Sequence, residues 1–361
     1  SGSACFDVAG ERDGAAVVNV TPVLPQGPGN GVLISSDAPA LPVASNVNYT
    51  PGRVDPNVAM ALIGDEGVCY VNSQHTPTHL VADHLGTIVG DAYIPATATG
   101  TPERKVDTRK GLGAPPVPVP ALGRLCFAVA GAPGDVAIVN LTPVEAQFAG
   151  NGQLISSDVA DAPIASNVNY APGTADPNVA FAPIGQDGTV CYVNSRHAAI
   201  HLVADHLGTI RKDAFVRATP TGAPERKLDT RIGLGGAMLP PGGRACMPVT
   251  GAPGDAAVVN LTPVEATGPG NAVLVSSDVT SAPNASNVNF DVGTTDPNVA
   301  IAPIGADGQV CVVNSTHSAV HMVADHLGSV RAAAYEPATA TGAPARLIDT
   351  RVDGTVISPS S

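Results

Sequence analysis

Short runs of aliphatic and β-branched residues, separated by Gly, Pro, Asn and Asp, follow one another along the whole chain. In its first third the runs cover residues 15–20, 31–35, 57–62, 67–72 and 79–84. Runs of this length bounded by turn-forming residues predict β-strands, and Asp-x-Gly or Asp-Gly between two of them predicts a hairpin. No window shows a helical period over ten or more residues. The pattern predicts an all-β protein built from β-sandwich or jelly-roll-like modules.

The pattern occurs three times. Asp-Pro-Asn-Val-Ala begins at residues 55, 176 and 296, and Asp-Thr-Arg begins at residues 107, 229 and 349. A period of about 120 residues is too long for a solenoid repeat but is the size of a small domain. We therefore predict β modules at 1–109, 125–231 and 245–361, joined by Pro/Gly-rich linkers at 110–124 and 232–244.

One segment leaves the arrangement of the modules open. Arg-x-x-Asp-Thr-Arg precedes modules two and three, none precedes Cys5, and a further copy stands at 346–351. If the segment belongs to the module that follows it, the C-terminal copy would complete module one and close a pseudo-threefold ring. If it belongs to the module before it, the array is linear. We favour the pseudo-threefold arrangement.

The six cysteines follow the same period. Six cysteines allow fifteen pairings, but the repeat favours one bridge within each module. The predicted pairs are Cys5 with Cys69, Cys126 with Cys191, and Cys246 with Cys311. Buried free thiols are the alternative. Disulfides persist in oxidising compartments, so we expect a secreted protein. Neither a signal peptide nor a membrane-spanning apolar run is visible, so we expect a mature, soluble chain without membrane insertion.

Charge and aromatic content narrow the choice of partner. The net charge of −13 argues against nucleic acid and against an anionic membrane surface, which both attract basic proteins. The chain has no tryptophan and only 3% aromatic residues. Because small sugar-binding β modules usually need aromatic platforms, this scarcity weakens a glycan-binding interpretation.

Six short motifs together resemble a known kind of repeat. They are Val-Asn-Leu-Thr-Pro-Val, Ser-Asn-Val-Asn, Pro-Asn-Val-Ala, Val-x-Asn-Ser, His-x-Val-Ala-Asp and Arg-Leu-Ile-Asp-Thr-Arg. The combination is similar to the β-rich tandem repeats of secreted and cell-surface actinobacterial proteins, which often stand beside cell-wall hydrolases and peptidases. The resemblance spans residues 4–351 and implies an extracellular, cell-envelope-associated module with no well-defined catalytic activity. His79, Asp83 and Tyr93 match the pattern of these repeats, whereas His75 and His84 depart from it.

All nine histidines belong to one motif that is present in each copy. They are His75, His79 and His84, then His197, His201 and His206, then His317, His321 and His326. Strand alternation places His79 and Asp83 on one face and His84 on the other, with His84 roughly 16–17 Å from His79. One metal ion therefore cannot bind all three histidines of a copy.

Several roles for the histidines remain open. The first two histidines of each copy could bind Zn²⁺ or Cu²⁺ at a hairpin tip, or His84, His206 and His326 could do so around a pseudo-threefold axis. Clustered imidazoles could instead sense pH, because their protonation below pH 6 creates repulsion. In a purely structural role, His79 would bond to backbone or to Asp83, and His84 would be a partly buried strand residue.

Other repeated elements carry weaker signals. Ser35-Ser36-Asp37 and its copies invite a hydrolase interpretation, but no Gly-x-Ser-x-Gly elbow is present and a turn in which Asp accepts backbone N–H bonds is favoured. Asp-Pro-Asn could supply oxygen ligands to Ca²⁺, although the EF-hand spacing is absent. Arg109, Arg231 and Arg351 are expected to form ion pairs at the module joints.

The sequence as a whole favours a secreted, non-enzymatic structural, adhesive or assembly protein of the cell surface. Its expected partner is a cell-envelope component or other copies of itself, not nucleic acid. The alternative is a metal-binding protein that uses the triplicated histidines. Glycan binding is weaker, and enzymatic activity is the most distant possibility.

Overall fold

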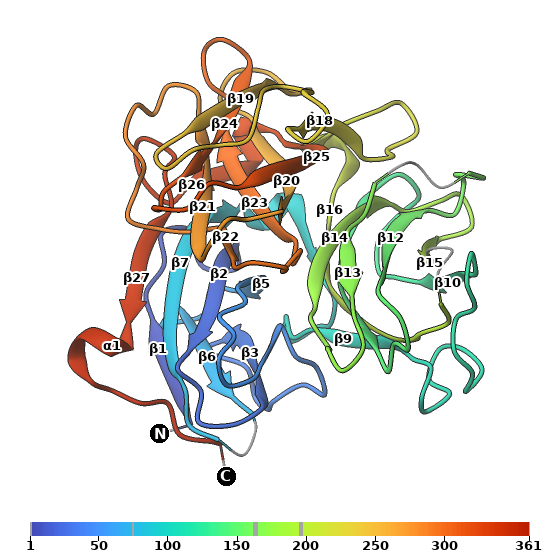
Figure 1. Cartoon of the computed structure of the whole chain (residues 1–361). Helices are drawn as coiled ribbons and strands as arrows, with labels where there is room; N and C mark the ends of the chain where they lie inside the picture. Colours follow the sequence, from blue (N-terminus) through green and yellow to red (C-terminus); the bar gives the residue numbers. More distant parts are fainter. Residues whose placement is uncertain (1, 74–75, 162–164, 195–197, 361) are drawn as a thin grey trace.

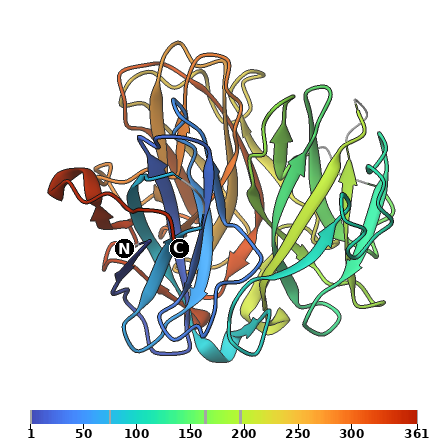
Figure 2. The same ribbon diagram turned by 90° about the horizontal axis from the view of Figure 1, so that it is seen from below.

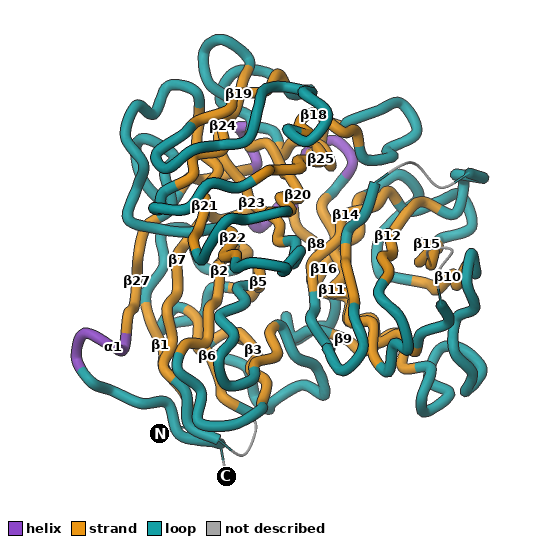
Figure 3. Tube along the Cα trace, viewed as in Figure 1, coloured by secondary structure: helices purple, strands orange, loops and turns teal. Residues whose placement is uncertain are grey.

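Strands account for nearly all the regular structure of the chain, which confirms the all-β class (Figure 3). The structure is a computed structural model that describes residues 2–73, 76–161, 165–194 and 198–360. Within these residues the helical elements are three single-turn 3₁₀ segments and one four-residue helix. The short strands follow from the apolar runs and from the glycines, prolines and asparagines between them.

The three copies contain corresponding strands. The first copy has β1 (Ser3–Phe6), β2 (Ala15–Val23), β3 (Gly29–Ser35), β4 (Val47–Tyr49), β5 (Asn57–Leu62), β6 (Val68–Asn72), β7 (His79–Ile88), η1 (Gly90–Ala92), β8 (Tyr93–Pro95) and β9 (Glu103–Asp107). The second has β10 (Arg124–Ala128), β11 (Val136–Val144), β12 (Gly150–Ser156), β13 (Val168–Tyr170), β14 (Asn178–Pro183), β15 (Thr189–Asn194), β16 (His201–Ile210), η2 (Lys212–Ala214), β17 (Phe215–Arg217) and β18 (Glu225–Asp229). The third has β19 (Arg244–Pro248), β20 (Ala256–Val264), β21 (Gly270–Ser276), β22 (Val288–Phe290), β23 (Asn298–Pro303), β24 (Gln309–Asn314), β25 (His321–Val330), η3 (Ala332–Ala334), β26 (Tyr335–Pro337), β27 (Ala345–Asp349) and α1 (Thr350–Asp353).

These strands form six antiparallel sheets, two for each copy of the repeat. The smaller sheets have the orders β1-β6-β3-β4, β10-β15-β12-β13 and β19-β24-β21-β22. The larger sheets are built on the central pairs β2–β7, β11–β16 and β20–β25, with β5, β14 and β23 at one edge. Figure 1 shows the strands of the three copies gathered around a common centre.

The other edge of each larger sheet comes from the preceding copy of the repeat. Strands β8 and β9 pair with β16, and strands β17 and β18 pair with β25. The last two strands, β26 and β27, pair with β7 and so return the C-terminal segment to the first copy (Figure 1). The Arg-x-x-Asp-Thr-Arg segment therefore belongs to the sheet of the copy that follows it, and the chain closes into a ring.

The two ends of the chain meet at the same strand. The backbone N–H of Asn72 donates to the carbonyl of Gly2 at 2.9 Å, and the N–H of Ser360 donates to the carbonyl of Asn72 at 2.8 Å. The termini accordingly lie close together in both views (Figures 1 and 2). Just before this point, Ile357 forms a bridge with Thr78, as Val119 does with Ile200 in the second copy. The C-terminal tail thus occupies in the first copy the place that the connecting segment takes in the second.

Two kinds of hydrophobic core hold the sheets together. One core lies between the smaller and larger sheets of each copy and includes Ala16, Val18 and Leu33 in the first. A further core forms where the three larger sheets meet, and Ala15 and Val17 contribute to it. Successive residues of β2 therefore point into different cores, which explains why the whole strand is buried. Residues 15–18 of β2 are all apolar for this reason.

The cores correct the prediction of three self-contained modules. The chain forms six blade-like sheets, and three of these contain strands from two copies of the repeat. Tyr335 shows how closely the copies interlock: its hydroxyl donates to the carbonyl of Leu85 at 2.6 Å, and a Cβ at Gly86 would lie 2.2 Å from that hydroxyl oxygen. Each copy therefore needs its neighbours to bury one face of its larger sheet.

The three disulfides have the predicted pairing. They join Cys5 to Cys69, Cys126 to Cys191, and Cys246 to Cys311. In each case the cysteines lie directly opposite one another on neighbouring antiparallel strands, β1 and β6 in the first copy and their equivalents in the others. Each bridge therefore staples the edge strand of a smaller sheet to its neighbour.

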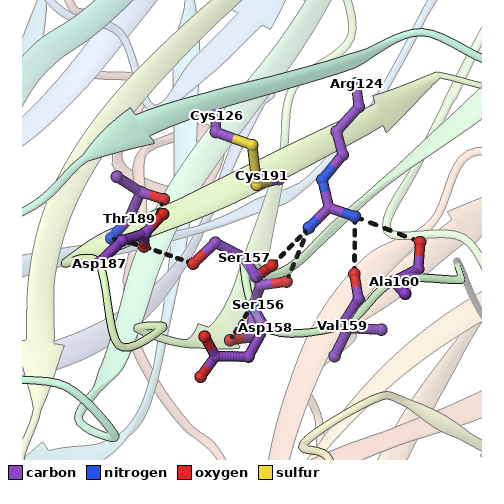
Figure 4. Close-up of a disulfide and its surroundings, with 10 residues drawn as sticks. All are labelled: Arg124, Cys126, Ser156, Ser157, Asp158, Val159, Ala160, Asp187, Thr189 and Cys191. Atoms are coloured by element: carbon purple, nitrogen blue, oxygen red, sulfur yellow. Dashed lines mark hydrogen bonds between the residues drawn. A yellow bond between two sulfur atoms is a disulfide. The ribbon is translucent and has the colours of Figure 1, made fainter.

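The Ser-Ser-Asp element next to the disulfide is a turn. In the second copy, Arg124 donates to the carbonyls of Ser157 at 3.0 Å and Val159 at 2.6 Å (Figure 4). Asp158 accepts a hydrogen bond of 3.0 Å from the backbone N–H of Gln186 in the adjacent hairpin. Asp37 and Asp278 accept equivalent backbone bonds from Asp65 and Ala306. The element fixes a loop to a hairpin, as the turn interpretation predicts.

Candidate functional site at the repeat junctions

A buried ion pair lies at each junction between copies of the repeat. Arg104 donates to Asp205 through Nε and Nη2 at 2.5 and 2.9 Å, and Arg226 binds Asp325 in the same way at 2.6 and 3.0 Å. Arg346 closes the ring through the equivalent bidentate contact with Asp83. The aspartate side chains are at most 1% exposed. Their burial raises the carboxyl pKa values, and the guanidinium contacts oppose that rise.

The arginines of these pairs are not the ones that the sequence pointed to. Arg109, Arg231 and Arg351 do form ion pairs, but with the aspartate two residues earlier in their own segment. Each thereby holds a local turn instead of linking two copies. The cross-copy contact is made by the arginine at the start of the segment, whose partner could not be identified before the position of the strand was known.

The second histidine of each motif contacts the threonine of an Asp-Thr-Arg segment from another part of the chain. Nδ1 of His79 lies 3.1 Å from Oγ1 of Thr350. The corresponding distances are 2.9 Å between His201 and Thr108 and 2.9 Å between His321 and Thr230. The same hydroxyl oxygens accept the backbone N–H groups of Leu80, Leu202 and Met322 at 2.9–3.0 Å. The threonine thus holds both the histidine and the strand that begins there.

The predicted pairing of the first two histidines of a motif at a hairpin tip can be examined only in the third copy, where both are described. His75 and His197 lie outside the described residues. His317 is described and is exposed to solvent. The expected contact of His79 with Asp83 is replaced by the contact with Thr350 described above.

The last histidine of each motif is buried in the core of its own copy. His84 lies opposite Val18 on the strand pair β2–β7, and Val18 belongs to the core between the two sheets of the first copy. Its Nε2 is 3.2 Å from Thr87 Oγ1, and that hydroxyl donates to the carbonyl of Ala9 at 2.5 Å. Because the hydroxyl proton is used there, Nε2–H is the donor to Thr87.

This placement repeats in the other two copies. His206 Nε2 lies 3.0 Å from Thr209 Oγ1, and His326 Nε2 lies 3.2 Å from Ser329 Oγ. Burial lowers the pKa of His84, His206 and His326 to about 4. The three imidazoles are neutral near pH 7 for that reason.

The structure therefore does not bring His84, His206 and His326 together at the centre where the three copies meet. Asp83 lies opposite Asn19 and faces the centre, so the next residue along the strand faces away from it. Among the residues that the structure describes, no group of three or more His, Cys, Asp or Glu side chains is arranged to hold a metal ion.

Asparagines occupy the centre instead. The Asn of each Asp-Pro-Asn motif donates through Nδ2 to a buried Asn of another copy: Asn57 to Asn140 at 2.9 Å, Asn178 to Asn260 at 2.8 Å, and Asn298 to Asn19 at 2.7 Å. The receiving asparagines donate in turn to the carbonyls of Ser45, Ser166 and Ser286. These bonds link the first copy to the second, the second to the third and the third to the first.

Next to the asparagines, the three aspartates of the same motifs surround one arginine. Arg53 Nε lies 2.8 Å from Asp55, its Nη1 lies 3.1 Å from Asp176, and its Nη2 lies 2.8 Å from Asp296. These four side chains are 21–31% exposed. Burial raises the pKa of Asp55 to about 7, against the opposing effect of Arg53, and the other two aspartates raise it further. We call Arg53, Asp55, Asp176 and Asp296 the axial cluster.

Sequence reasoning identified the carboxylates of this cluster but not its cation. The Asp-Pro-Asn motifs were candidates for Ca²⁺ ligands, whereas Arg53 was not singled out. A signal was present, because the second and third copies have Thr174 and Thr294 where the first has Arg53. A single charged residue that breaks a threefold pattern marks a place where one side chain can serve all three copies.

Comparison with known proteins adds little. No protein-family model matches the chain, and no curated protein matches it. A solved structure titled "The Triple Jelly Roll Fold and Turret Assembly in an Archaeal Virus" is 6% identical with a TM-score of 0.21, covering 91% of this chain and 83% of its own. A structure of Sulfolobus Turreted Icosahedral Virus is 7% identical, with the same TM-score and coverage. At this TM-score we draw no argument from either.

Within the described residues, no helix has the length and apolar character needed to span a membrane.

Proposed function

We propose that the protein is a secreted, non-enzymatic structural component of a cell surface that serves as a rigid scaffold for adhesion or assembly. The observation that carries the proposal is the use made of the repeated polar residues. The junction arginines, the aspartates beside them, the Asp-Thr-Arg threonines and the central asparagines all bind other parts of the same chain. Side chains in such contacts hold a shape and are not free to bind or turn over a substrate.

The closed ring supports a scaffold in particular. Each junction combines shared strands, a buried ion pair and an asparagine bond, so opening one junction breaks all three kinds of contact. Each smaller sheet is additionally stapled by a disulfide. Disulfides are consistent with an oxidising, extracellular environment. We infer further that each pair of sheets is a sandwich of jelly-roll type, related to the others by a pseudo-threefold axis.

The location and partner come from the resemblance to actinobacterial surface repeats. We infer that the scaffold associates with a cell-envelope component or with other copies of itself. The excess of acidic residues supports neither nucleic acid nor an anionic lipid surface as the partner.

Co-sedimentation with purified cell-wall sacculi tests the proposal, with analytical ultracentrifugation of the protein alone to detect self-association. The matched control is the same chain after reduction and alkylation in denaturant, which keeps the composition and is used once circular dichroism shows that the folded shape is lost. We expect the folded chain to sediment with sacculi or to self-associate, to do so better than the control, and to release no soluble cell-wall fragments. Release of fragments would show an enzyme, and a monomer that stays entirely in the supernatant would contradict the scaffold role.

A further inference from the structure

A polar groove lies where the third copy of the repeat meets the first. It consists of two adjoining hollows of about 600 and 520 Å³, which share Asn271, Asn284, Ser286 and Arg346 in their linings. Strands β2 and β7 form the wall on the side of the first copy, and β21, β22 and the loop at 280–286 form the opposite wall. Each hollow has the volume of a typical ligand site, and together they have room for an extended chain.

The arginines of the groove are already paired. Arg346 and Arg351 each hold an aspartate. Arg53 holds the three aspartates of the axial cluster, and Arg244 donates to backbone carbonyls. An anionic ligand would have to displace these partners, and the exposed carboxylate of Asp291 attracts a cationic one only weakly. The groove therefore favours an uncharged ligand.

Neutral hydrogen-bonding groups of the groove, in contrast, are open. Thr21 is 3% exposed, and its buried hydroxyl has no hydrogen-bond partner among the described residues. On the opposite wall, the side chains of Asn271, Ser315 and the loop residue Asn284 form no hydrogen bond within the part of the chain that the structure describes. A buried hydroxyl without a partner is costly, and a ligand that hydrogen-bonds to it recovers that cost. Carboxamides and hydroxyls both donate and accept, so the groove offers both kinds of contact.

The open asparagines and serine distinguish the third copy from the first. In the first copy, Asn30 and Ser73 stand where the third has Asn271 and Ser315, and their side chains hydrogen-bond to each other. Its Val43, which is 78% exposed, stands where the third copy has the loop asparagine. The third copy thus presents free polar side chains where the first has them paired or replaced by an apolar one.

We propose that this groove binds a linear, uncharged polysaccharide of N-acetylated sugars. Sugar hydroxyls and acetamido groups donate and accept hydrogen bonds, which matches the open hydroxyls and carboxamides of the groove. The carboxamide of Asn284 can pair with an acetamido group through complementary N–H and C=O groups. Phe290, an aromatic residue of the lining, is 5% exposed, so binding relies on hydrogen bonds and not on stacking. The polysaccharide would be the cell-envelope partner of the scaffold, and in this respect the inference rests on the proposed function.

Isothermal titration calorimetry with hexa-N-acetylchitohexaose, a linear hexamer of N-acetylglucosamine, tests the proposal on the full chain with its disulfides intact. We expect one hexamer per chain with a Kd of about 10⁻⁴–10⁻³ M, since each hydrogen bond exchanged with water adds little net free energy. The variant Asn284→Val gives the third copy the residue of the first and should raise the Kd about tenfold. Asn271→Ala should raise the Kd by a similar factor.

Two controls show whether the groove and the acetamido groups are responsible. Val43→Asn is the reciprocal exchange at the equivalent exposed position of the first copy and should leave the Kd unchanged. Cellohexaose, which has hydroxyl groups but no acetamido groups, should bind at least about tenfold more weakly than the acetylated hexamer. Circular dichroism verifies that each variant is folded.

The possible outcomes separate the groove from the scaffold. Failure of wild type to bind the acetylated hexamer at millimolar concentration overturns the proposal, as does equal affinity of wild type and Asn284→Val or equal affinity for the two hexamers. If Asn271→Ala does not fold, the variant at the exposed position 284 decides alone. Sedimentation with sacculi without hexamer binding would overturn the groove and leave the scaffold role. Hexamer binding that is weakened by Asn284→Val, in a chain that neither sediments nor self-associates, would support the groove and contradict the scaffold.

Discussion

The three buried histidines should make the folded chain sensitive to acid. The pKa of His84, His206 and His326 is lowered to about 4 in the folded chain by burial, whereas an exposed histidine in the unfolded chain titrates near 6.5. The unfolded chain therefore takes up protons first as the pH falls. Stability supplied by the neutral imidazoles is present above about pH 6.5 and is lost between there and about pH 4.

The size of the effect follows from the two pKa values. Between pH 7 and pH 5, each histidine should lower the free energy of unfolding by about 2 kcal/mol, and the three together by about 5–6 kcal/mol. The charged groups that act on these sites are few: Lys105 lowers the pKa of His206 further, and Lys227 and Glu225 act in opposite directions on His326. Burial is the largest cause in all three copies.

The perturbation is the triple variant His84→Gln, His206→Gln and His326→Gln, which keeps a side-chain donor but cannot take up a proton. Urea unfolding followed by circular dichroism at pH 7 and pH 5 gives the loss of stability for wild type and variant. The variant should lose about 5–6 kcal/mol less than wild type over this range. His317→Gln, at an exposed position, is the control and should behave as wild type. An equal loss in wild type and triple variant would refute the reasoning.

Three further predictions follow from the junctions and the centre. Arg346→Ala leaves Asp83 buried without its partner and should lower the free energy of unfolding in urea by about 3–5 kcal/mol. The control Arg351→Ala, at a side chain that is 46% exposed, should lower it by less than about 1 kcal/mol. Equal losses would contradict the assignment of the junction. Burial raises the pKa of Asp55 to about 7, so the protonated carboxyl stabilises the fold at low pH and this stabilisation is lost as the pH rises from about 4 to about 7. The free energy of unfolding of Asp55→Asn should therefore rise by about 2–3 kcal/mol relative to that of wild type between pH 5 and pH 8. No relative rise in urea unfolding would show that the carboxyl titrates normally. Elemental analysis of protein purified without chelator should give less than about a tenth of a Zn or Cu per chain, since six of the seven described imidazoles contact separate hydroxyl groups. A stoichiometric metal would restore the metal-binding interpretation.

Much of the local structure could be predicted because it depends on neighbours in the sequence. The apolar runs and turn residues predict the strands, and the repeat singles out the cysteine pairs from fifteen possibilities. Strand alternation also separates Asp83 from His84 correctly. Each of these predictions needs only the period of a strand or of the repeat.

What could not be predicted depends on how the copies meet. Alternation separates the faces of β7 but does not say which face looks to the centre, so His84 was placed there as a candidate when Asp83 has that position. The partner of Arg104 is 101 residues away and becomes evident only once β9 is known to pair with β16. The role of Arg53 likewise depends on three motifs from three copies meeting at one point.

The closure of the ring by the C-terminal tail is tested most directly by native-state hydrogen exchange on three matched variants. Val119, Leu239 and Ile357 are equivalent residues, each at most 4% exposed, and bridge the copies that contain β16, β25 and β7 respectively. Replacing each by Ala removes buried methyl groups and should cost up to about 5 kcal/mol. We predict faster exchange in β16 for Val119→Ala, in β25 for Leu239→Ala, and in β7 for Ile357→Ala. Faster exchange confined to the third copy in Ile357→Ala, with β7 unchanged, would contradict the closed ring.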